Sequence, residues 1–302
     1  MKTNALTVLV IGATGQQGGA VARSLLQKGH RVKALTRHPD SQGAQELKKL
    51  GADVVMGDLM ERSTVERACQ GVSAMFSVGT FIEQGVGAEI RQGKTAVDVA
   101  KAVGLQHLLY TSVAGANQQT GISFFDCKNE IEQYIMSQNV PYTIIAPTFF
   151  MQNLTNEQMF LPGLREGKLS IAVSAKRTIQ CIDVTNIGQF ATMVFEQRSD
   201  FLSQRIELAS DELTPVQMAS TLSRICGRKI EYAQMPIDKV RAMNADMATM
   251  FEWFERVGHN VNINDLRGEY PEARWHSFEQ WAQAQNWKAL LGAGERATAG
   301  SR

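Results

Sequence analysis

A glycine-rich turn near the N-terminus constrains the fold more than any other segment of this chain. An apolar run over residues 8–11 ends at Gly12, and glycines recur at Gly15 and Gly18 before a helical pattern of apolar residues begins. Glycine lets the backbone turn sharply and approach a phosphate, and the helix N-terminus offers free N–H groups and a positive dipole end. The spacing is G-x-x-G-x-x-G, one step different from G-x-G-x-x-G. A strand, a glycine turn and a helix in this order predict a site for a dinucleotide pyrophosphate.

The end of the second predicted strand indicates which dinucleotide binds. Residues 31–37 alternate in polarity and stop at His38-Pro39, where proline ends the element. Arg37 stands where an NAD-specific site would place an acidic residue against the ribose 2'-hydroxyl. An arginine there can bind a 2'-phosphate bidentately, so NADP(H) is the favoured cofactor. The alternative is a solvated arginine at a strand end.

Composition excludes several other classes of function. The 302 residues can bury a large core, with 20% charged and 44% hydrophobic residues. A net charge of +1 and only short basic clusters give no reason to expect direct nucleic-acid binding or a membrane surface. No apolar run approaches the roughly 20 residues that cross a bilayer. Four cysteines without metal-ligand spacing predict reduced thiols, no metal site and a cytoplasmic location: Cys69, Cys127, Cys181 and Cys226.

The first half alternates short apolar runs with amphipathic stretches, which predicts an α/β fold with a doubly wound parallel sheet. The predicted strands are residues 7–11, 31–35, 53–56, 74–77, 107–110 and 142–146, and the predicted helices are 18–27, 43–50, 63–69, 87–103 and 124–138. Small or polar residues follow four of these strands: Gly57-Asp58, Val78-Gly79-Thr80, Thr111-Ser112 and Pro147-Thr148. Ligands bind outside the carboxyl ends of parallel strands, so these residues are expected beside the glycine turn.

The pattern changes after about residue 150. We expect a nucleotide-binding domain over residues 1–152, whose sheet can receive later segments, a smaller α/β lobe over 153–291, and a disordered tail over 292–302. Later strands are predicted at residues 169–172, 178–182, 205–208 and 229–232, with helices starting after Asp183 and at Thr214-Pro215. The last third carries all four tryptophans. Helix packing is the favoured role for them, and a substrate pocket is the alternative.

The usual hydride-transfer acid is missing from this chain. Short-chain dehydrogenases use a Tyr-x-x-x-Lys pair on one helix face and a serine from the preceding strand end, and the lysine charge favours the phenolate. Ser112 and Lys128 stand at the serine and lysine positions, and both are candidate catalytic residues. The residue four before Lys128 is Phe124, which has no exchangeable proton.

Other residues are candidates to replace the missing acid. Tyr110 shares a strand face with Ser112 but is also a candidate for burial in the sheet. Asp126, Cys127 and Tyr134 lie on other helix faces than Lys128, which makes a joint role geometrically awkward. Lys128 itself either protonates a substrate oxygen or anchors the nicotinamide ribose, and the anchoring role is favoured.

At this point the chain resembles the NmrA-like branch of the atypical short-chain dehydrogenases, and most closely its HSCARG-type NADPH-sensor members. The matching segments are Gly-Ala-Thr-Gly-Gln-Gln-Gly-Gly (12–19), Thr-Arg-His-Pro (36–39), Gly-Ala-Asp-Val-Val-Met-Gly-Asp (51–58), Arg-Gln-Gly-Lys (91–94), Phe-Asp-Cys-Lys (125–128) and Thr-Phe-Phe-Met-Gln-Asn-Leu (148–154). The likeness covers most of the chain and is densest before residue 155. Many members also lack the tyrosine.

The resemblance implies a Rossmann-type domain with a smaller C-terminal α/β lobe and a cleft between them. It implies Arg37 on the 2'-phosphate, residues 57–59 near the adenine, and Lys128 with the turn 147–150 beside the nicotinamide and its ribose. The expected cofactor-binding residues are Gly12, Thr14, Gly15, Gln16, Gln17, Gly18, Arg37, Asp58, Leu59, Gly79, Thr80, Lys128, Pro147, Phe149 and Phe150.

Two functions remain open. The first is a sensor or regulator that responds to NADP(H) with little classical dehydrogenase activity. The second is an NADPH-dependent reductase of a quinone or another electron-poor small molecule, with Phe81 and the pair 149–150 giving the site an apolar floor. An epimerase, which normally needs the tyrosine, ranks below both. A small-molecule substrate or a protein partner is expected in the cleft between the lobes, and a homodimer is compatible with the sequence.

Overall fold

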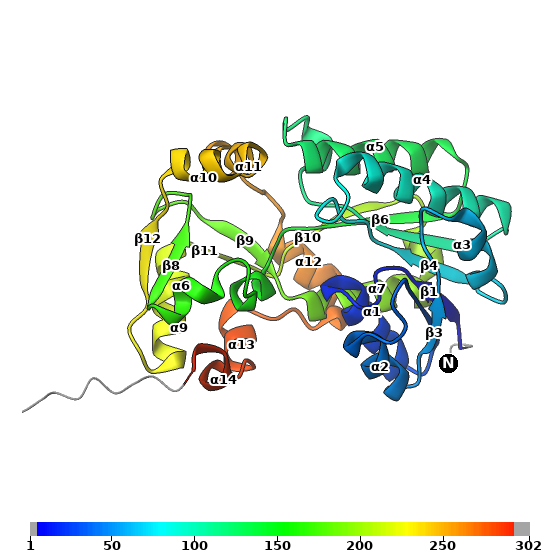
Figure 1. The fold of residues 1–302 in the computed structure, drawn as a ribbon, viewed down its shortest axis with the longest axis horizontal. Coiled ribbons are helices and arrows are strands. Elements are labelled where there is room, and N and C mark those ends of the chain that lie inside the picture. The colour runs from blue at the N-terminus through cyan, green and yellow to red at the C-terminus, as the bar shows by residue number, and fades with distance from the viewer. Residues whose placement is uncertain (1–4, 293–302) are drawn as a thin grey trace, which may run out of the picture. The chain divides into compact units, whose positions relative to one another are not determined.

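The computed structural model describes residues 5–292, which fold into two compact units (Figure 1). The first unit runs to Thr148 and also takes Val184–Ala209 and Val261–Trp275. Among the described residues, the second unit consists of Phe149–Asp183, Ser210–Asn260 and residues 276–292. The chain therefore passes between the units several times. The sequence predicts domains 1–152 and 153–291, with a first sheet that can receive later segments. The tail expected to be disordered lies, apart from Gly292, outside the described residues.

A parallel sheet forms the centre of the first unit. Its strands lie in the order β10-β6-β5-β4-β1-β2-β3, and every pairing is parallel. The bounds are β1 Thr7–Val10, β2 Arg31–Thr36, β3 Asp53–Met56, β4 Ala74–Ser77, β5 His107–Thr111, β6 Tyr142–Pro147 and β10 Arg205–Leu208. This confirms the predicted doubly wound sheet. The chain reverses direction across the sheet between β1 and β4, which is where such sheets bind ligands.

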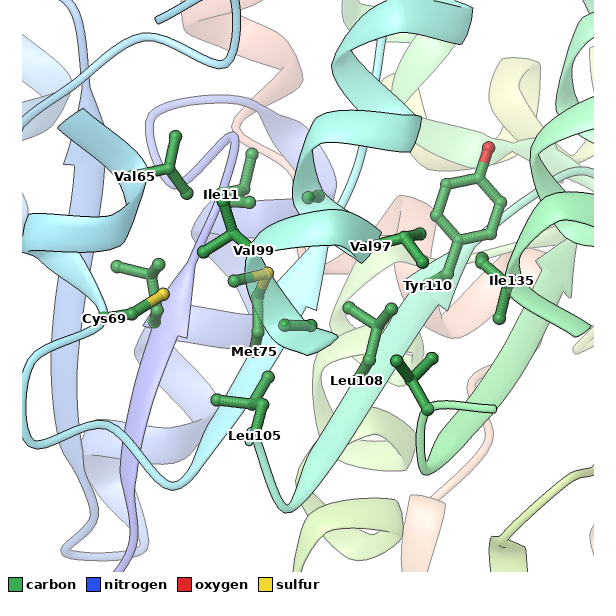
Figure 2. Close-up of a cluster of buried hydrophobic side chains, with 14 of the residues drawn as sticks. Ile11, Val65, Cys69, Met75, Val97, Val99, Leu105, Leu108, Tyr110 and Ile135 are labelled. Atoms are coloured by element: carbon green, nitrogen blue, oxygen red, sulfur yellow. The ribbon is translucent and has the colours of Figure 1, made fainter. Parts of the chain in front are cut away.

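Helices cover both faces of this sheet (Figure 1). The bounds are α1 Gln16–Gln27, α2 Gln42–Lys49, α3 Arg62–Ala68, α4 Val86–Ala102, η1 Ala116–Gln118, α5 Ser123–Ser137, α7 Val184–Glu196, α8 Arg198–Phe201, α12 Ile263–Glu269 and η3 Pro271–Ala273. Buried side chains of α3, α4 and α5 pack on one face in a single apolar cluster (Figure 2). Val65, Val97 and Ile135 come from these helices, while Met75 and Tyr110 come from the strands.

Helix α7 and strand β10 explain why residues 184–209 belong to the first unit. A Cβ atom on Gly188 would lie 2.5 Å from the Ala20 carbonyl oxygen, so the backbones of α7 and α1 are in close contact. Strand β10 extends the sheet by pairing with β6. Asn186 of α7 donates to the Ala273 carbonyl at 2.9 Å, which ties the returning segment 261–275 to the same unit. These contacts span long sequence separations, so composition alone did not locate the boundary.

The second unit carries two small sheets, ordered β11-β9-β7 and β12-β8. The strands are β7 Phe149–Phe150, β8 Lys168–Ile171, β9 Ile179–Ile182, β11 Asp211–Leu213 and β12 Glu231–Gln234. The helices are η2 Met151–Thr155, α6 Leu161–Arg165, α9 Pro215–Cys226, α10 Ile237–Met243, α11 Ala245–Arg256, α13 Phe278–Gln283 and α14 Trp287–Leu291. Strands β7 and β11 were not predicted, because two or three residues give no periodicity to read.

Two predictions for the later segments meet different outcomes. Thr214 caps α9 with its side chain, accepting from the Gln217 N–H, and Pro215 occupies the first turn as predicted. The strand predicted at 229–232 instead runs over Glu231–Gln234. The Ile230 N–H donates to the Ser223 hydroxyl of α9, so pairing with β8 starts at Glu231.

The aromatic residues of the last third are packing residues. Trp253, Trp275, Trp281 and Trp287 are all buried. Within the first unit Trp275 packs against Phe190, and within the second unit Trp281 contacts Trp287 edge to face. This confirms the packing role favoured from the sequence over a substrate pocket.

We expect stability to fall between pH 6.5 and pH 5 because of His107, at the amino end of β5. Burial first, and then the charge of Arg198, lower the pKa of this imidazole to about 4. Thr143 donates its one hydroxyl hydrogen to the Phe201 carbonyl, so His107 Nε2 donates to Thr143 and Nδ1 carries no proton. The unfolded chain, with a histidine pKa near 6.5, then binds a proton that the native state rejects.

The free energy of unfolding should therefore drop by about 2 kcal/mol between these two pH values. Urea denaturation at each pH measures this drop. The His107→Asn variant should show a flatter pH profile. An unchanged slope in that variant would assign the acid sensitivity to another group.

Candidate functional site

The glycine turn has the geometry that an anion site requires. Gly12 has a φ of +67°, and a Cβ there would lie 2.4 Å from a Val78 methyl group. The Gly15 N–H donates to the Gly12 carbonyl at 2.9 Å, which closes the turn. Gly15 is the N-cap of α1, no side chain caps this helix end, and its first turn holds no acidic residue. The free N–H groups and the dipole of a twelve-residue helix thus remain available to an anion.

Gly18 is expected to tolerate no side chain. A Cβ there would lie 2.2 Å from the Gly12 carbonyl oxygen and 2.9 Å from the Ala13 nitrogen, and backbone atoms cannot move aside. We expect Gly18→Ala to lower the free energy of unfolding by about 1–3 kcal/mol, as overpacking does. The control is Gly268→Ala in α12, where a Cβ meets nothing within 4 Å. Denaturation of both variants checks this, and equal stability of the two would contradict it.

The remaining residues of the turn face the carboxyl edge of the sheet. Thr14, Gly15 and Gln16 are exposed, and Gln17 is half-buried. The Thr111 hydroxyl at the end of β5 donates to Gln17 Oε1 at 2.8 Å, which holds α1 against that edge. The structure therefore brings the glycine turn together with the ends of β4 and β5, as the polar strand ends indicated.

Arg37 directly follows the last residue of β2, and its guanidinium has an ion-pair partner in this structure. Its guanidinium forms an ion pair with the Glu83 carboxylate, which comes from the loop between β4 and α4. Both side chains are exposed, with 37% and 55% of their surface accessible. The sequence placed Arg37 at this edge but gave no signal for Glu83, which lies in a loop without periodicity.

Residues 57–59 form a fixed turn after β3. A Cβ on Gly57 would lie 2.6 Å from a Leu35 methyl group. The Asp58 N–H donates to Thr64, and the Asp58 carboxylate accepts from the Met60 N–H at 2.9 Å. Asp58 and Leu59 are half-buried. The turn lies on the same sheet edge as Arg37, because β3 pairs parallel with β2.

Lys128 lies in a buried ion pair that the sequence did not indicate. Its Nζ atom is 2.5 Å from Oε1 of Glu89, and the Glu89 side chain is 0% exposed while that of Lys128 is 13% exposed. Cys127 donates to the other Glu89 oxygen at 3.5 Å, and burial followed by the Glu89 charge raises the pKa of this thiol to about 12. Cys127 and Lys128 lie on different faces of α5, and Glu89 contacts both through its two carboxylate oxygens.

A signal for Glu89 exists in the sequence of α4. Its buried residues include Glu89, Gly93, Ala96, Val97 and Ala100, so Glu89 begins the apolar stripe of an amphipathic helix. A carboxylate on that stripe requires a buried partner. Glu89 also packs against the end of β4, since a Cβ on Gly79 would lie 2.8 Å from its Cγ. Thr80, the next residue, is exposed.

The position of the missing tyrosine is filled by stacked aromatic rings. The Phe124 ring lies parallel to that of Phe81, with centroids 4.6 Å apart and planes at 14°. Tyr110 is buried in the sheet, and burial followed by the charge of Glu89 raises the pKa of its hydroxyl well above the usual value. Tyr134 donates to Asp98 instead. Ser112 is also buried, and within residues 5–292 its hydroxyl has no hydrogen-bond partner.

Three expected cofactor residues lie at the end of β6 or beyond it. Pro147 ends that strand in the first unit and is buried. Phe149 and Phe150 form β7 in the second unit and are half-buried. There Phe149 contacts Phe160 edge to face, with ring centroids 5.9 Å apart.

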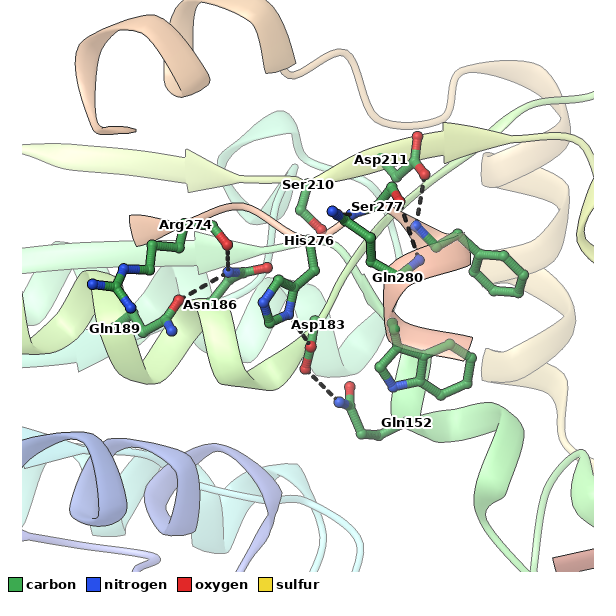
Figure 3. Close-up of polar contacts among 12 residues, drawn as sticks. Gln152, Asp183, Asn186, Gln189, Ser210, Asp211, Arg274, His276, Ser277 and Gln280 are labelled. Atoms are coloured by element: carbon green, nitrogen blue, oxygen red, sulfur yellow. Dashed lines mark hydrogen bonds and ion pairs between the residues drawn. The ribbon is translucent and has the colours of Figure 1, made fainter. Parts of the chain in front are cut away.

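The second unit holds a polar cluster of its own. The Asp183 carboxylate binds the His276 imidazole at 2.7 Å and accepts from the Gln152 amide at 2.6 Å (Figure 3). A carboxylate that is buried in this way fixes the orientation of the imidazole. Among the described residues, no group of three or more His, Cys, Asp or Glu side chains is arranged to hold a metal ion.

The strand order of the parallel sheet, with an uncapped glycine turn beside the point between β1 and β4 where that order reverses, defines a Rossmann-type α/β protein. The NmrA-like family model matches residues 4–283, and the chain belongs to that family. An NmrA-like family domain-containing protein of Dictyostelium discoideum is 29% identical over 297 residues, which cover 93% of this chain and 98% of the relative. An NAD(P)H azoreductase of Xenophilus azovorans is 25% identical over 234 residues, covering 78% and 79% of the two chains.

Solved structures share the fold. NmrA, a negative transcriptional regulator crystallised in complex with NADP, superposes with a TM-score of 0.77 at 20% identity, covering 93% of this chain and 95% of that one. Among residues 5–292, no helix combines the length and apolar character that crossing a bilayer demands.

Proposed function

We propose that this protein binds NADP(H) in its first unit and acts as a sensor of that nucleotide, with little classical dehydrogenase activity. The observation that carries the proposal is the pair of stacked rings at the tyrosine position. Phe124 stands at the position of the missing acid, the Phe81 ring stacks on the Phe124 ring, and Tyr110 is buried in the sheet. The site thus keeps the glycine turn and the carboxyl edge of the sheet, where a nucleotide would bind. It holds no phenol placed for proton transfer.

The residues present fit a dinucleotide phosphate. A Cβ at Gly12 would overlap a Val78 methyl group and one at Gly18 would overlap the Gly12 carbonyl oxygen, so both positions require glycine. The N-terminus of α1 is uncapped and free of acidic side chains. Residues 12–18 would hold the pyrophosphate, Arg37 the 2'-phosphate, and Asp58 and Leu59 the adenosine side. Lys128 would anchor the nicotinamide ribose, with Gly79, Thr80 and Pro147 beside it.

A reductase is the second candidate, and one observation favours it. The stacked pair of Phe81 and Phe124 gives the nicotinamide end an aromatic surface, and a relative at 25% identity is named NAD(P)H azoreductase. The bound cofactor would supply a hydride, and a quinone or azo compound needs less help from a protein acid than a ketone does. The role of this chain's residues would then be to position an apolar acceptor and to exclude water.

One assay separates the two candidates. The protein is mixed with NADPH and a panel of quinones, azo dyes and aldehydes, and loss of NADPH absorbance is followed. The matched variant is Phe124→Tyr, which adds one hydroxyl at the position of the missing acid. We expect saturable NADPH binding and no turnover by the wild-type protein. Turnover of any panel member by the wild-type protein would contradict the sensor function and favour the reductase function.

A further inference from the structure

The loop of residues 79–85, which joins β4 to α4, contacts both ends of the proposed nucleotide site. At one end Glu83 forms the ion pair with Arg37. At the other end Phe81 stacks on Phe124, one turn before Lys128 in α5. The loop is short, so these two contacts belong to one local structure. We call it the β4–α4 loop.

Within the β4–α4 loop, Phe81 and Glu83 belong to one turn that a backbone hydrogen bond closes. The Gly85 N–H donates to the Phe81 carbonyl at 2.7 Å and closes a turn that contains Glu83. The Ile82 N–H donates to the Thr80 hydroxyl at 3.3 Å, while the Ile82 side chain is 79% exposed. The turn contacts the rest of the first unit through the Phe81 ring, through the Glu83 ion pair and through a hydrogen bond from the Gln92 amide of α4 to Gln84 at 3.4 Å.

The Glu83 carboxylate resembles the ligand that Arg37 is proposed to bind. A guanidinium presents a planar fork of donors that suits a carboxylate or a phosphate equally. Both partners of the Arg37–Glu83 pair are exposed, and exposed ion pairs are weak and screened by salt. A phosphate carries more charge than a carboxylate, so it can displace Glu83 from the fork. A 2'-hydroxyl has no such charge.

We propose that Glu83 is an internal competitor of the nucleotide 2'-phosphate, so that NADP(H) releases the β4–α4 loop and NAD(H) does not. This inference rests on the proposed function, and it names the residue through which the nucleotide would be sensed. When a 2'-phosphate binds Arg37, the turn loses its ion pair at the Arg37 end. Phe81 can then separate from Phe124. Binding of the 2'-phosphate at Arg37 would thus change the structure at the nicotinamide end.

The test measures nucleotide affinity and loop protection in the same proteins. Dissociation constants for NADP⁺ and NAD⁺ are determined by calorimetry at low salt for the wild type, Glu83→Gln and Asp40→Asn. Asp40 is an exposed carboxylate in the turn after Arg37, and its variant removes the same charge without an ion pair to that arginine. We expect Glu83→Gln to bind NADP⁺ about 1.5- to 5-fold more tightly, with NAD⁺ affinity unchanged.

Hydrogen exchange of residues 79–89 gives the second readout. Exchange of the Gly85 and Glu89 amides should accelerate in the wild type with NADP⁺ but not with NAD⁺, and should be fast in Glu83→Gln without ligand. The inference is overturned if Glu83→Gln alters NADP⁺ affinity no more than Asp40→Asn, or if both nucleotides change exchange equally. A wild-type protein that binds neither nucleotide would instead overturn the proposed function, and this inference with it.

Discussion

Replacing Lys128 with methionine is expected to lower the free energy of unfolding by about 3–5 kcal/mol. The Glu89 carboxylate is 0% exposed, and the Lys128 ammonium 2.5 Å away compensates its charge. Methionine keeps the apolar stem and removes the charge, so a carboxylate stays buried with only the Cys127 thiol as its hydrogen-bond donor among the contacts described. Removing one partner of a buried pair costs far more than replacing both. Urea denaturation followed by circular dichroism measures this loss.

Two controls make the Lys128 prediction specific. The double variant Glu89→Gln/Lys128→Met removes both charges and should recover most of the stability. Lys94→Met breaks the exposed pair between Lys94 and Glu130, with side chains 37% and 50% accessible, and should cost less than about 1 kcal/mol. A Lys128→Met protein as stable as Lys94→Met would contradict the account. Lost activity in Lys128→Met therefore assigns no catalytic role unless the double variant is also tested.

The second large effect is expected at Arg37. Replacing it with aspartate should weaken NADPH binding at least about 100-fold and change NADH binding by less than about 3-fold. Two charge-assisted hydrogen bonds to the 2'-phosphate are lost, each contributing about 1.5–3 kcal/mol, and a repulsive charge is added. NADH presents a neutral hydroxyl at the same place. Calorimetric titration with both nucleotides measures the two constants.

The matched control for Arg37 is Arg31→Asp. Arg31 lies at the amino end of the same strand, β2, and is exposed. The change of charge is identical, but the residue is at the opposite edge of the sheet from the glycine turn, so neither nucleotide should bind more weakly. Equal losses for NADPH and NADH in Arg37→Asp would refute the assigned 2'-phosphate contact.

The fold of the first unit could be predicted because its signals are local. Most strands of the parallel sheet are short apolar runs, while β2 and β10 alternate in polarity, and the glycine spacing indicates the turn at Gly12 and Gly18. The division into units could not be predicted in the same way. It depends on the close approach of Gly188 to Ala20, which joins segments far apart in the chain. A two-residue strand such as β7 leaves no pattern at all.

In the candidate site, the sequence predicted only one residue of each ion pair. Arg37 and Lys128 were found because their positions follow from a strand end and from a helix spacing. Their partners Glu83 and Glu89 come from the β4–α4 loop and from α4, and only folding brings them near. Spacing along the chain carries no information about such pairs. The carboxylate on the apolar stripe of α4 was the one available sign.

The central claim is that the first unit binds a phosphorylated dinucleotide. Calorimetric titration of the full chain with NADPH, repeated with NADH, tests it most directly. The account predicts saturable binding at one site per chain, with NADPH bound more tightly than NADH. Absence of saturable binding by either nucleotide, or tighter binding of NADH, would contradict it.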